Sequence, residues 1–366
     1  MFKSFTRIAA VIAAVMLLAP AARASSAAAR ASTAPARFGV VDGRLIGATP
    51  AAMDAALNQD AALGVTAVRE QLSWNATEPS PGVYKWAAFD QVASSVAAHH
   101  MQLLVLIDFT PAWARLPGCA SWACAPAEPS QFAAFAGVAA ARYGSEVAAW
   151  EVWNEPNTAD FWKPVPNAAA YSQLLKLTAA AIRHAAPGAY IVSGGLAPSQ
   201  GGRFTLRPVD FLSGMCESGG VAALDAVGDH PYSFPVPPDY QAGWNAWQQM
   251  DNTPISLRSV MTRCGASAKP IWITEYGAPT GGPGVAASPG NYMLLLHPTH
   301  VTEALQAQMA AAAIKDVDSY PWVGALFFYS ATDAGTAPTT NQNFFGLSNA
   351  SGSPKPAWYT VQSLLG

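Results

Sequence analysis

Short apolar, β-prone runs alternate along this chain with longer Ala-rich stretches. Eight such runs recur, each of a length that suits one buried strand. They occupy residues 38–41, 65–72, 103–109, 147–153, 190–194, 226–230, 271–275 and 324–329. Their starts lie roughly 41 residues apart on average, which leaves room for a strand, a helix and two loops in each repeat.

The stretches between the runs have helical composition and spacing. The clearest cover residues 51–63, 89–100, 131–143, 168–186 and 302–316. Alternation of strands with helices predicts a parallel sheet, and eight strand–helix units are what a (β/α)8 barrel requires. We therefore expect an α/β fold, a (β/α)8 TIM barrel in a single domain. An open doubly wound sheet is the alternative, but the glycine-rich turns at Gly194 and Gly281 lack the spacing of a phosphate-binding loop.

The first 36 residues depart from this pattern. Lys3 and Arg7 precede an apolar stretch at residues 8–19 that is too short to span a bilayer comfortably, and Ala22-Arg-Ala24 is a typical cleavage site. Residues 1–24 are predicted to be a signal peptide, 25–36 a flexible leader and 37–366 the folded domain. We expect a secreted protein, extracellular or periplasmic, that does not insert into the membrane after cleavage.

Charge and composition narrow the possible partners. The net charge is −3, and loss of Lys3, Arg7 and Arg23 with the signal peptide brings it to −6. No basic run is present, so no nucleic-acid partner is expected. The chain is 51% hydrophobic and contains 12 Trp, 11 Tyr and 15 Phe. Most of these rings should pack in the core, but several stand beside polar residues at strand ends, where flat rings also suit the faces of sugars.

Four cysteines in an exported chain suggest disulfides, and four allow three pairings. Cys119 and Cys124 share one short loop, whereas Cys216 and Cys264 end two successive helical segments. We expect the pairs Cys119–Cys124 and Cys216–Cys264, with free buried thiols as the alternative. No metal site and no cofactor are expected, because no ligand cluster of suitable spacing accompanies the cysteines.

Two glutamates end predicted strands. In a (β/α)8 barrel the active site lies at the carboxyl ends of the strands. Run four continues as Trp-Asn-Glu-Pro, so Asn154 and Glu155 should lie at its tip, because Pro156 cannot extend the strand. Run seven ends as Thr-Glu-Tyr-Gly, with Glu275 at the same edge. Glycoside hydrolysis requires two such carboxylates, one that protonates the leaving oxygen and one that attacks the anomeric carbon or activates water.

Other polar residues at the strand ends suit the same chemistry. Arg69, in run two, supplies a positive charge that would keep a neighbouring carboxylate ionised. Tyr232, just after run six, could donate a hydrogen bond to the same carboxylate. Asn154 could bind the 2-hydroxyl of a sugar, a contact that strengthens in the transition state.

With these motifs the sequence resembles the clan-A glycoside hydrolases, the retaining (β/α)8 superfamily that includes cellulases, xylanases and β-xylosidases. The resemblance implies that Glu155 is the general acid/base and Asn154 its 2-hydroxyl partner. It implies that Glu275 is the nucleophile. Arg69 matches the arginine of strand two, and His230 and Tyr232 match an H-x-Y pair after strand six.

The resemblance covers nearly the whole mature chain, including residues 74–90 and 346–358. Two features depart from it. Asp108 stands where several families of the clan have a histidine, and Phe328-Tyr329 ends run eight where several have a tryptophan. These departures leave the family and the sugar open. The pattern is nearest to the xylosidase-like and exopolysaccharide-hydrolase branches.

Aromatic and acidic residues near the strand ends have less specific interpretations. Trp74, Trp113 and Tyr329 are candidate substrate-binding residues, with packing in the core as the alternative for Trp113. Further predictions concern structural roles: Glu151 as an interior acid paired with Arg69, Glu70 and Glu78 as loop or rim charges, Trp153 as cleft or core, and Trp272 as packed against a helix.

The sequence thus predicts a secreted, monomeric, retaining O-glycoside hydrolase. Its substrate would be a polysaccharide or oligosaccharide, cleaved by double displacement, and residues 37–366 would form its catalytic domain. A non-catalytic carbohydrate-binding protein on the same fold is the alternative from another class. A retaining transglycosidase is a variant of the first prediction, in which a sugar acceptor outcompetes water.

Overall fold

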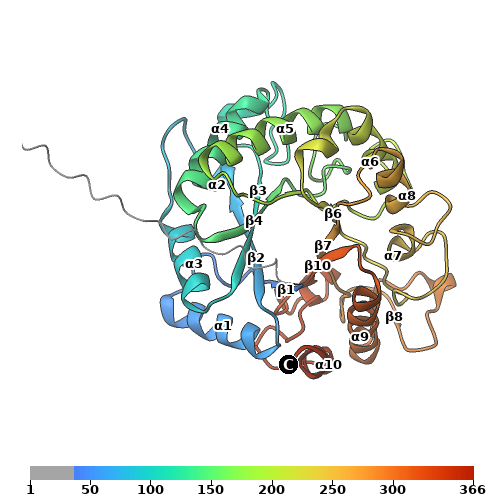
Figure 1. Ribbon diagram of the computed structural model, residues 1–366. Coiled ribbons are helices and arrows are strands. Elements are labelled where there is room, and N and C mark those ends of the chain that lie inside the picture. The colour runs from blue at the N-terminus through green and yellow to red at the C-terminus, as the bar shows by residue number, and fades with distance from the viewer. Residues whose placement is uncertain (1–36) are drawn as a thin grey trace, which may run out of the picture. The chain divides into compact units, whose positions relative to one another are not determined.

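A computed structural model describes residues 37–366, so the predicted signal peptide and leader lie outside the described residues. Eight parallel strands stand in the centre and helices surround them (Figure 1). The barrel strands are β1 (Phe38–Val41), β2 (Ala67–Ser73), β3 (Gln102–Asp108), β4 (Val147–Val152), β5 (Ile191–Ser193), β6 (Val227–Asp229), β7 (Ile271–Tyr276) and β10 (Val323–Tyr329). Each overlaps one of the eight predicted runs.

The strands form a closed barrel. Their order is β5-β4-β3-β2-β1-β10-β7-β6, and β1 pairs in parallel with β10. The strands at the two ends of this order meet through parallel bridges, Val192 with Ala226 and Leu196 with Asp229. The predicted (β/α)8 barrel is therefore confirmed.

Helices follow most strands. Their bounds are α1 (Pro50–Ala62), α2 (Trp74–Thr77), α3 (Ala87–Ala98), α4 (Pro129–Tyr143), α5 (Ala168–Ala185), α6 (Pro208–Glu217), α7 (Ala246–Gln249), α8 (Leu257–Arg263), α9 (Glu303–Ser319) and α10 (Pro356–Leu365), with short 3-10 helices η1 (Ala112–Ala114), η2 (Gly220–Ala223), η3 (Leu294–Leu296) and η4 (Asn341–Phe344). Side-chain caps start several of them. Thr49 accepts from the backbone of Ala52 at the start of α1, and Thr302 caps α9 in the same way.

One small sheet was not predicted. Strands β8 (Ala286–Ala287) and β9 (His300–Val301) pair in parallel within the long connection between β7 and α9. Two-residue strands leave no periodic signal in the sequence.

The core has an outer layer between strands and helices and a smaller layer inside the barrel. The inner layer consists of Ala67, Leu104, Ala149, Val192, Ala226, Trp272, Ala325 and Phe327. Two large rings fill the space that the alanines leave. The prediction that Trp272 packs against a helix was therefore wrong, because its position in β7 points into the barrel, where its ring stacks on Tyr190 with centroids 5.1 Å apart.

A bulge in β7 determines how that strand presents its polar end. Ile273 pairs with Leu326 of β10, but the next pair is Tyr276 with Phe328, so β7 has one extra residue. Ile273 and Tyr276 both belong to the outer layer. The two residues between them, Thr274 and Glu275, can both reach the barrel interior, which strict alternation would forbid.

Both predicted disulfides are present. Cys119 pairs with Cys124 in the loop after β3, and Cys216 pairs with Cys264 between the ends of α6 and α8. Within residues 37–366, every helix is too short or too polar to cross a membrane.

Candidate active site

A cleft of about 710 Å³ opens at the carboxyl ends of the strands. Most of the predicted site residues line it: Arg69, Asn154, Glu155, Tyr232, Glu275 and Tyr329. They come from β2, from the segments after β4 and β6, from β7 and from the end of β10. The structure therefore brings together side chains that are more than 200 residues apart in the sequence.

A tight backbone turn after β4 presents Asn154 and Glu155 to this cleft. Trp153 and Glu155 have φ angles of 72° and 43°, a left-handed backbone conformation that residues other than glycine rarely adopt. The turn is fixed on both sides, because Trp153 N–H donates to Ile107 O at 2.8 Å and Glu155 N–H donates to Gly195 O at 3.1 Å. The Trp153 ring is fully buried, which confirms its core reading.

Glu275 lies opposite, between two donors. Its Oε1 accepts from Arg69 Nη1 at 2.6 Å, and its Oε2 accepts from the Tyr232 hydroxyl at 2.7 Å. Its side chain remains 12% exposed to the cleft. Both oxygens are thus held, so the carboxylate has a defined orientation.

Arg69 is itself fixed from below. Its Nε donates to Glu151 Oε2 at 2.5 Å and its Nη2 to Asn154 Oδ1 at 3.1 Å. Glu151 is fully buried, and its other oxygen accepts from Thr274 Oγ1 at 2.8 Å and from Gly195 N–H at 3.0 Å. The prediction of Glu151 as an interior acid paired with Arg69 is confirmed.

His230 lies beneath both glutamates and is fully buried. Because the Thr274 hydroxyl donates to Glu151, His230 Nε2 must be the donor in its 3.0 Å contact with Thr274 Oγ1. Its Nδ1 faces Glu155 Oε1 at 3.0 Å, so one proton lies between imidazole and carboxyl group. Gly195 makes room for the ring, since a Cβ there would lie 2.1 Å from His230 Nε2.

The two glutamates have opposite electrostatic environments. Burial raises the pKa of Glu155 by more than its contact with His230 lowers it. For Glu275, burial also acts to raise the pKa, but the charges of His230 and Arg69 and the hydrogen bond from Tyr232 outweigh it, and the pKa lies below its ordinary value. Burial acts to lower the pKa of His230. The charge of Glu275 and the contact with Glu155 outweigh this effect, so the pKa of His230 is raised. One carboxyl group is therefore suited to hold a proton and the other to stay ionised.

The same three side chains are close together. One oxygen of Glu155, one ring nitrogen of His230 and one oxygen of Glu275 all lie within 4.8 Å of one another. Such a group could hold a metal ion, but the Arg69 guanidinium at 2.6 Å from Glu275 already supplies the positive charge that a cation would bring. The donor set suits proton transfer better than metal binding.

Two predicted site residues lie away from the cleft. Trp74 is fully buried, and its Nε1 donates to Glu78 Oε2 at 2.7 Å. Trp113 packs edge-on against Trp74 with ring centroids 5.4 Å apart, and its Nε1 donates to Glu78 O at 3.0 Å. Neither ring lines the cleft, because α2 turns the chain so that Trp74 packs behind β2 and β3. Glu70 and Glu78 were predicted to be loop or rim charges. Glu70 lies in β2 and is buried, so that prediction was wrong for it; Glu78 follows α2 in a loop as predicted, but it is buried.

Gln71, Phe109 and Phe161 line the cleft but were not singled out from the sequence. Asp108, which was singled out, is fully buried and does not line it. Gln71 Nε2 donates to both oxygens of Asp108, at 3.0 and 2.8 Å, and burial raises the pKa of Asp108 well above its ordinary value. Phe109 and Phe161 line the cleft beyond them. A signal for Asp108 and Phe109 was present in the sequence, since both end run three at the edge where the active site was expected.

Comparison with known proteins adds a family. The model of Glycosyl hydrolases family 39 matches residues 133–365. Comparison with curated protein sequences gives no match.

Many solved structures have a similar fold. A family 39 glycoside hydrolase from the gut symbiont Bacteroides cellulosilyticus WH2 superposes with a TM-score of 0.69 at 22% identity, over 90% of this chain and 63% of that one. This chain therefore spans less than two thirds of that protein. A monomeric β-xylosidase from Caulobacter crescentus CB15 gives a TM-score of 0.62 at 19% identity, over 89% and 67% of the two chains. A GH5_18 protein from Streptomyces cattleya, in complex with Manβ1-4GlcNAc, gives 0.63 at 19% identity, over 90% and 80%.

Proposed function

The chain belongs to glycosyl hydrolases family 39, and on that basis we propose that it hydrolyses O-glycosidic bonds in a polysaccharide or oligosaccharide by double displacement. The observation that supports this most is the pair Glu155 and Glu275. Their facing atoms lie within 4.8 Å of each other, and their pKa values are shifted in opposite directions. Retaining glycosidases hold their two carboxyl groups about 5–5.5 Å apart, whereas inverting enzymes leave roughly 6.5–9.5 Å for a water.

In the first step Glu275 attacks the anomeric carbon while Glu155 gives its proton to the leaving oxygen. The bond from the anomeric carbon to the leaving oxygen breaks, and an ester to Glu275 forms. Arg69 and Tyr232 keep Glu275 ionised and aimed before attack. Asn154, whose Oδ1 accepts from Arg69 at 3.1 Å, has its amide N–H2 free of any described partner and can donate to the sugar 2-hydroxyl.

In the second step Glu155, now a carboxylate, takes a proton from water, which attacks the anomeric carbon and releases Glu275. The pKa of Glu155 falls between the two steps, because esterification removes the negative charge of Glu275. His230 is a positioning residue here, since it touches both carboxylates from below but does not line the cleft.

Two structural neighbours support a proposal for the substrate class. One neighbour is described as a β-xylosidase and another was solved with Manβ1-4GlcNAc. We therefore propose a β-linked glycan of pyranose sugars as the substrate, acted on outside the cytoplasm by a monomer. Residues 1–24 would be removed as a signal peptide, 25–36 would be a leader, and 37–366 would be the catalytic domain. The two disulfides support an oxidising compartment.

An activity panel tests this proposal. Purified protein would be assayed against aryl β-glycosides of xylose, mannose, glucose and galactose and against β-1,3- and β-1,4-linked oligosaccharides, with Glu275→Gln as the matched inactive control. We expect turnover of at least one sugar class by the wild type and none by the variant. Binding of oligosaccharides without turnover would instead support the non-catalytic alternative, and glycosyl transfer to added sugars in preference to water would support the transglycosidase variant.

A further inference from the structure

A second groove of about 640 Å³ adjoins the cleft above β2 and the loop after β1. The two hollows have four lining residues in common: Gly43, Glu70, Gln71 and Phe109. They therefore form one continuous surface, and a chain of sugars seated in the cleft could extend into the groove without leaving the protein.

An exposed tryptophan borders this groove. Trp122 is 42% exposed and lies in the groove lining. Its ring centroid is 4.1 Å from that of Phe109 and 5.9 Å from that of Phe161, and both phenylalanines line the catalytic cleft. The three rings form an aromatic surface at the junction of cleft and groove. Flat apolar rings with one accessible face suit the apolar faces of pyranose sugars.

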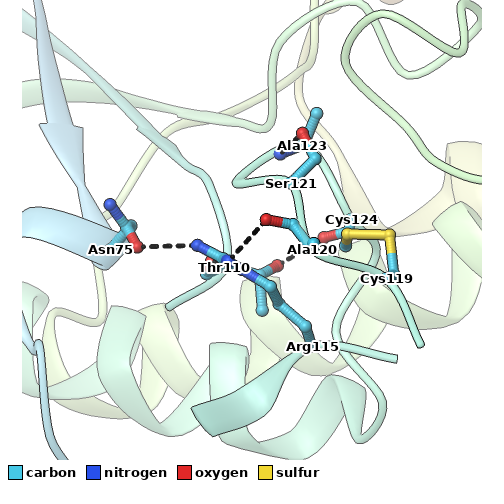
Figure 2. The surroundings of a disulfide bond; sticks show 8 residues. All are labelled: Asn75, Thr110, Arg115, Cys119, Ala120, Ser121, Ala123 and Cys124. Carbon is cyan, nitrogen blue, oxygen red and sulfur yellow. Dashed lines mark hydrogen bonds between the residues drawn. A yellow bond between two sulfur atoms is a disulfide. The ribbon is translucent and has the colours of Figure 1, made fainter. Parts of the chain in front are cut away.

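The loop that holds Trp122 is fixed in several ways. The disulfide Cys119–Cys124 brackets it, and Arg115 donates to Ala120 O at 3.0 Å and to Asn75 Oδ1 at 3.1 Å (Figure 2). The backbone of Thr110 donates to Trp122 O at 3.0 Å. A loop with this many restraints loses little conformational freedom when a ligand binds, so the ring is preorganised.

Part of the groove lining is polar. Gln71, Asn75 and Lys85 belong to it. The Gln71 amide nitrogen is held by Asp108, so Gln71 offers its amide oxygen, whereas Asn75 and Lys85 offer amide and ammonium donors. Glu70, which lines both hollows, is buried, and its Oε1 has no hydrogen-bond partner among the described residues. A groove whose lining combines aromatic rings with several polar groups has the composition of a carbohydrate site.

We propose that this groove is a further saccharide subsite, in which Trp122, supported by Phe109, stacks on a sugar unit beyond the one that is cleaved. The proposal rests on the proposed function, since it makes the substrate an oligosaccharide or polysaccharide rather than a simple glycoside. The Cys119–Cys124 disulfide is then a positioning device for the ring.

The test compares Trp122→Ala with Trp244→Ala. Trp244 is a matched control, because it is 43% exposed but lines neither hollow. Kinetics would be measured on an aryl monoglycoside and on β-linked oligosaccharides of two to six units of the same sugar. We expect Trp122→Ala to lose kcat/KM on the longer oligosaccharides by about tenfold more than on the aryl monoglycoside, an effect of about 1.4 kcal/mol, and Trp244→Ala to match the wild type. The variant Cys119→Ser/Cys124→Ser should show a smaller loss in the same direction.

A binding measurement separates this proposal from the proposed function. The same oligosaccharides would be titrated calorimetrically into Glu275→Gln protein with and without Trp122→Ala. If affinity and kcat/KM for every oligosaccharide are the same with and without Trp122, the subsite is refuted while hydrolysis stands. If binding depends on Trp122 but the wild type cleaves nothing, the hydrolase is refuted while the subsite stands. Absence of any oligosaccharide binding would overturn the subsite.

Discussion

Replacing Arg69 with Met removes the guanidinium that lies between the buried carboxylate of Glu151 and the cleft-facing carboxylate of Glu275. The side chain of Arg69 is 3% exposed, and it contacts Glu151 at 2.5 Å and Glu275 at 2.6 Å. Without it Glu151 keeps a negative charge in a fully buried position, with only Thr274 and the backbone of Gly195 as donors. Removing one partner of a buried pair typically costs about 3–5 kcal/mol.

That cost can be converted to a thermal shift. Unfolding entropy is about 2.1 cal/mol/K per residue, so a domain of about 330 residues should lose about 4–7 °C in Tm, and it should stay folded. Loss of a preorganised charge partner of the nucleophile should also lower kcat/KM by about 10²–10³-fold. Thermal melts by circular dichroism and kinetics on the same preparations would measure both effects.

The double variant Arg69→Met/Glu151→Gln tests the reasoning. It removes the uncompensated charge on Glu151 but leaves Glu275 without its cation. We expect it to regain part of the lost stability relative to Arg69→Met and none of the lost activity. If Arg69→Met is as stable as the wild type, or if the double variant recovers turnover, the assigned role of Arg69 is wrong.

Three further predictions follow from the same geometry. Glu155→Ala should lower the rate of hydrolysis by about 10²–10⁴-fold on substrates with poor leaving groups and by less on activated aryl glycosides. Added azide should restore turnover and give a glycosyl azide of retained configuration. Equal losses on both substrate types would contradict the acid role. The pH profile of kcat/KM should be bell-shaped, rising with pH as Glu275 ionises and falling as Glu155 loses its proton. Tyr232→Phe should move the acidic limb to higher pH, because a donor that lowers the pKa of Glu275 is lost. An unmoved limb would argue against Tyr232 as that donor. Peptide mapping should find Cys119–Cys124 and Cys216–Cys264 in protein from the oxidising compartment, and four free thiols would contradict this. The disulfides close sequence separations of 5 and 48 residues, so removing them should lower the free energy of unfolding by about 2 and 4 kcal/mol, respectively.

The barrel and both glutamates were predictable because the signals are local. A buried parallel strand reads as an apolar run, and strands of one barrel end at a common edge, so Glu155 and Glu275 could be placed together from their positions alone. Glu151 lies four residues before Glu155 on the same strand, so strand alternation puts both on one face, and the predicted pairing of Glu151 with Arg69 is confirmed.

What could not be predicted depends on packing between distant segments. Trp74 follows a strand directly, but its ring packs against Phe132 and Phe135 of α4, which no local pattern reveals. The extra residue in β7 that lets Thr274 join Glu275 inside the barrel appears only in the pairing with β10. Trp122 lies in a loop without periodicity, and only its contact with Phe109 reveals its place beside the cleft.

The central claim is that Glu275 forms a covalent ester with the sugar and that configuration is retained. Protein inactivated with a 2-deoxy-2-fluoro glycoside of the sugar found by the activity panel would be digested and analysed by peptide mass spectrometry. Proton NMR would follow the first product released from an unmodified substrate. We predict a single label on Glu275 and initial release of the same anomer as the substrate. A label on any other residue, or initial release of the opposite anomer, would contradict the mechanism even though the barrel remains the same.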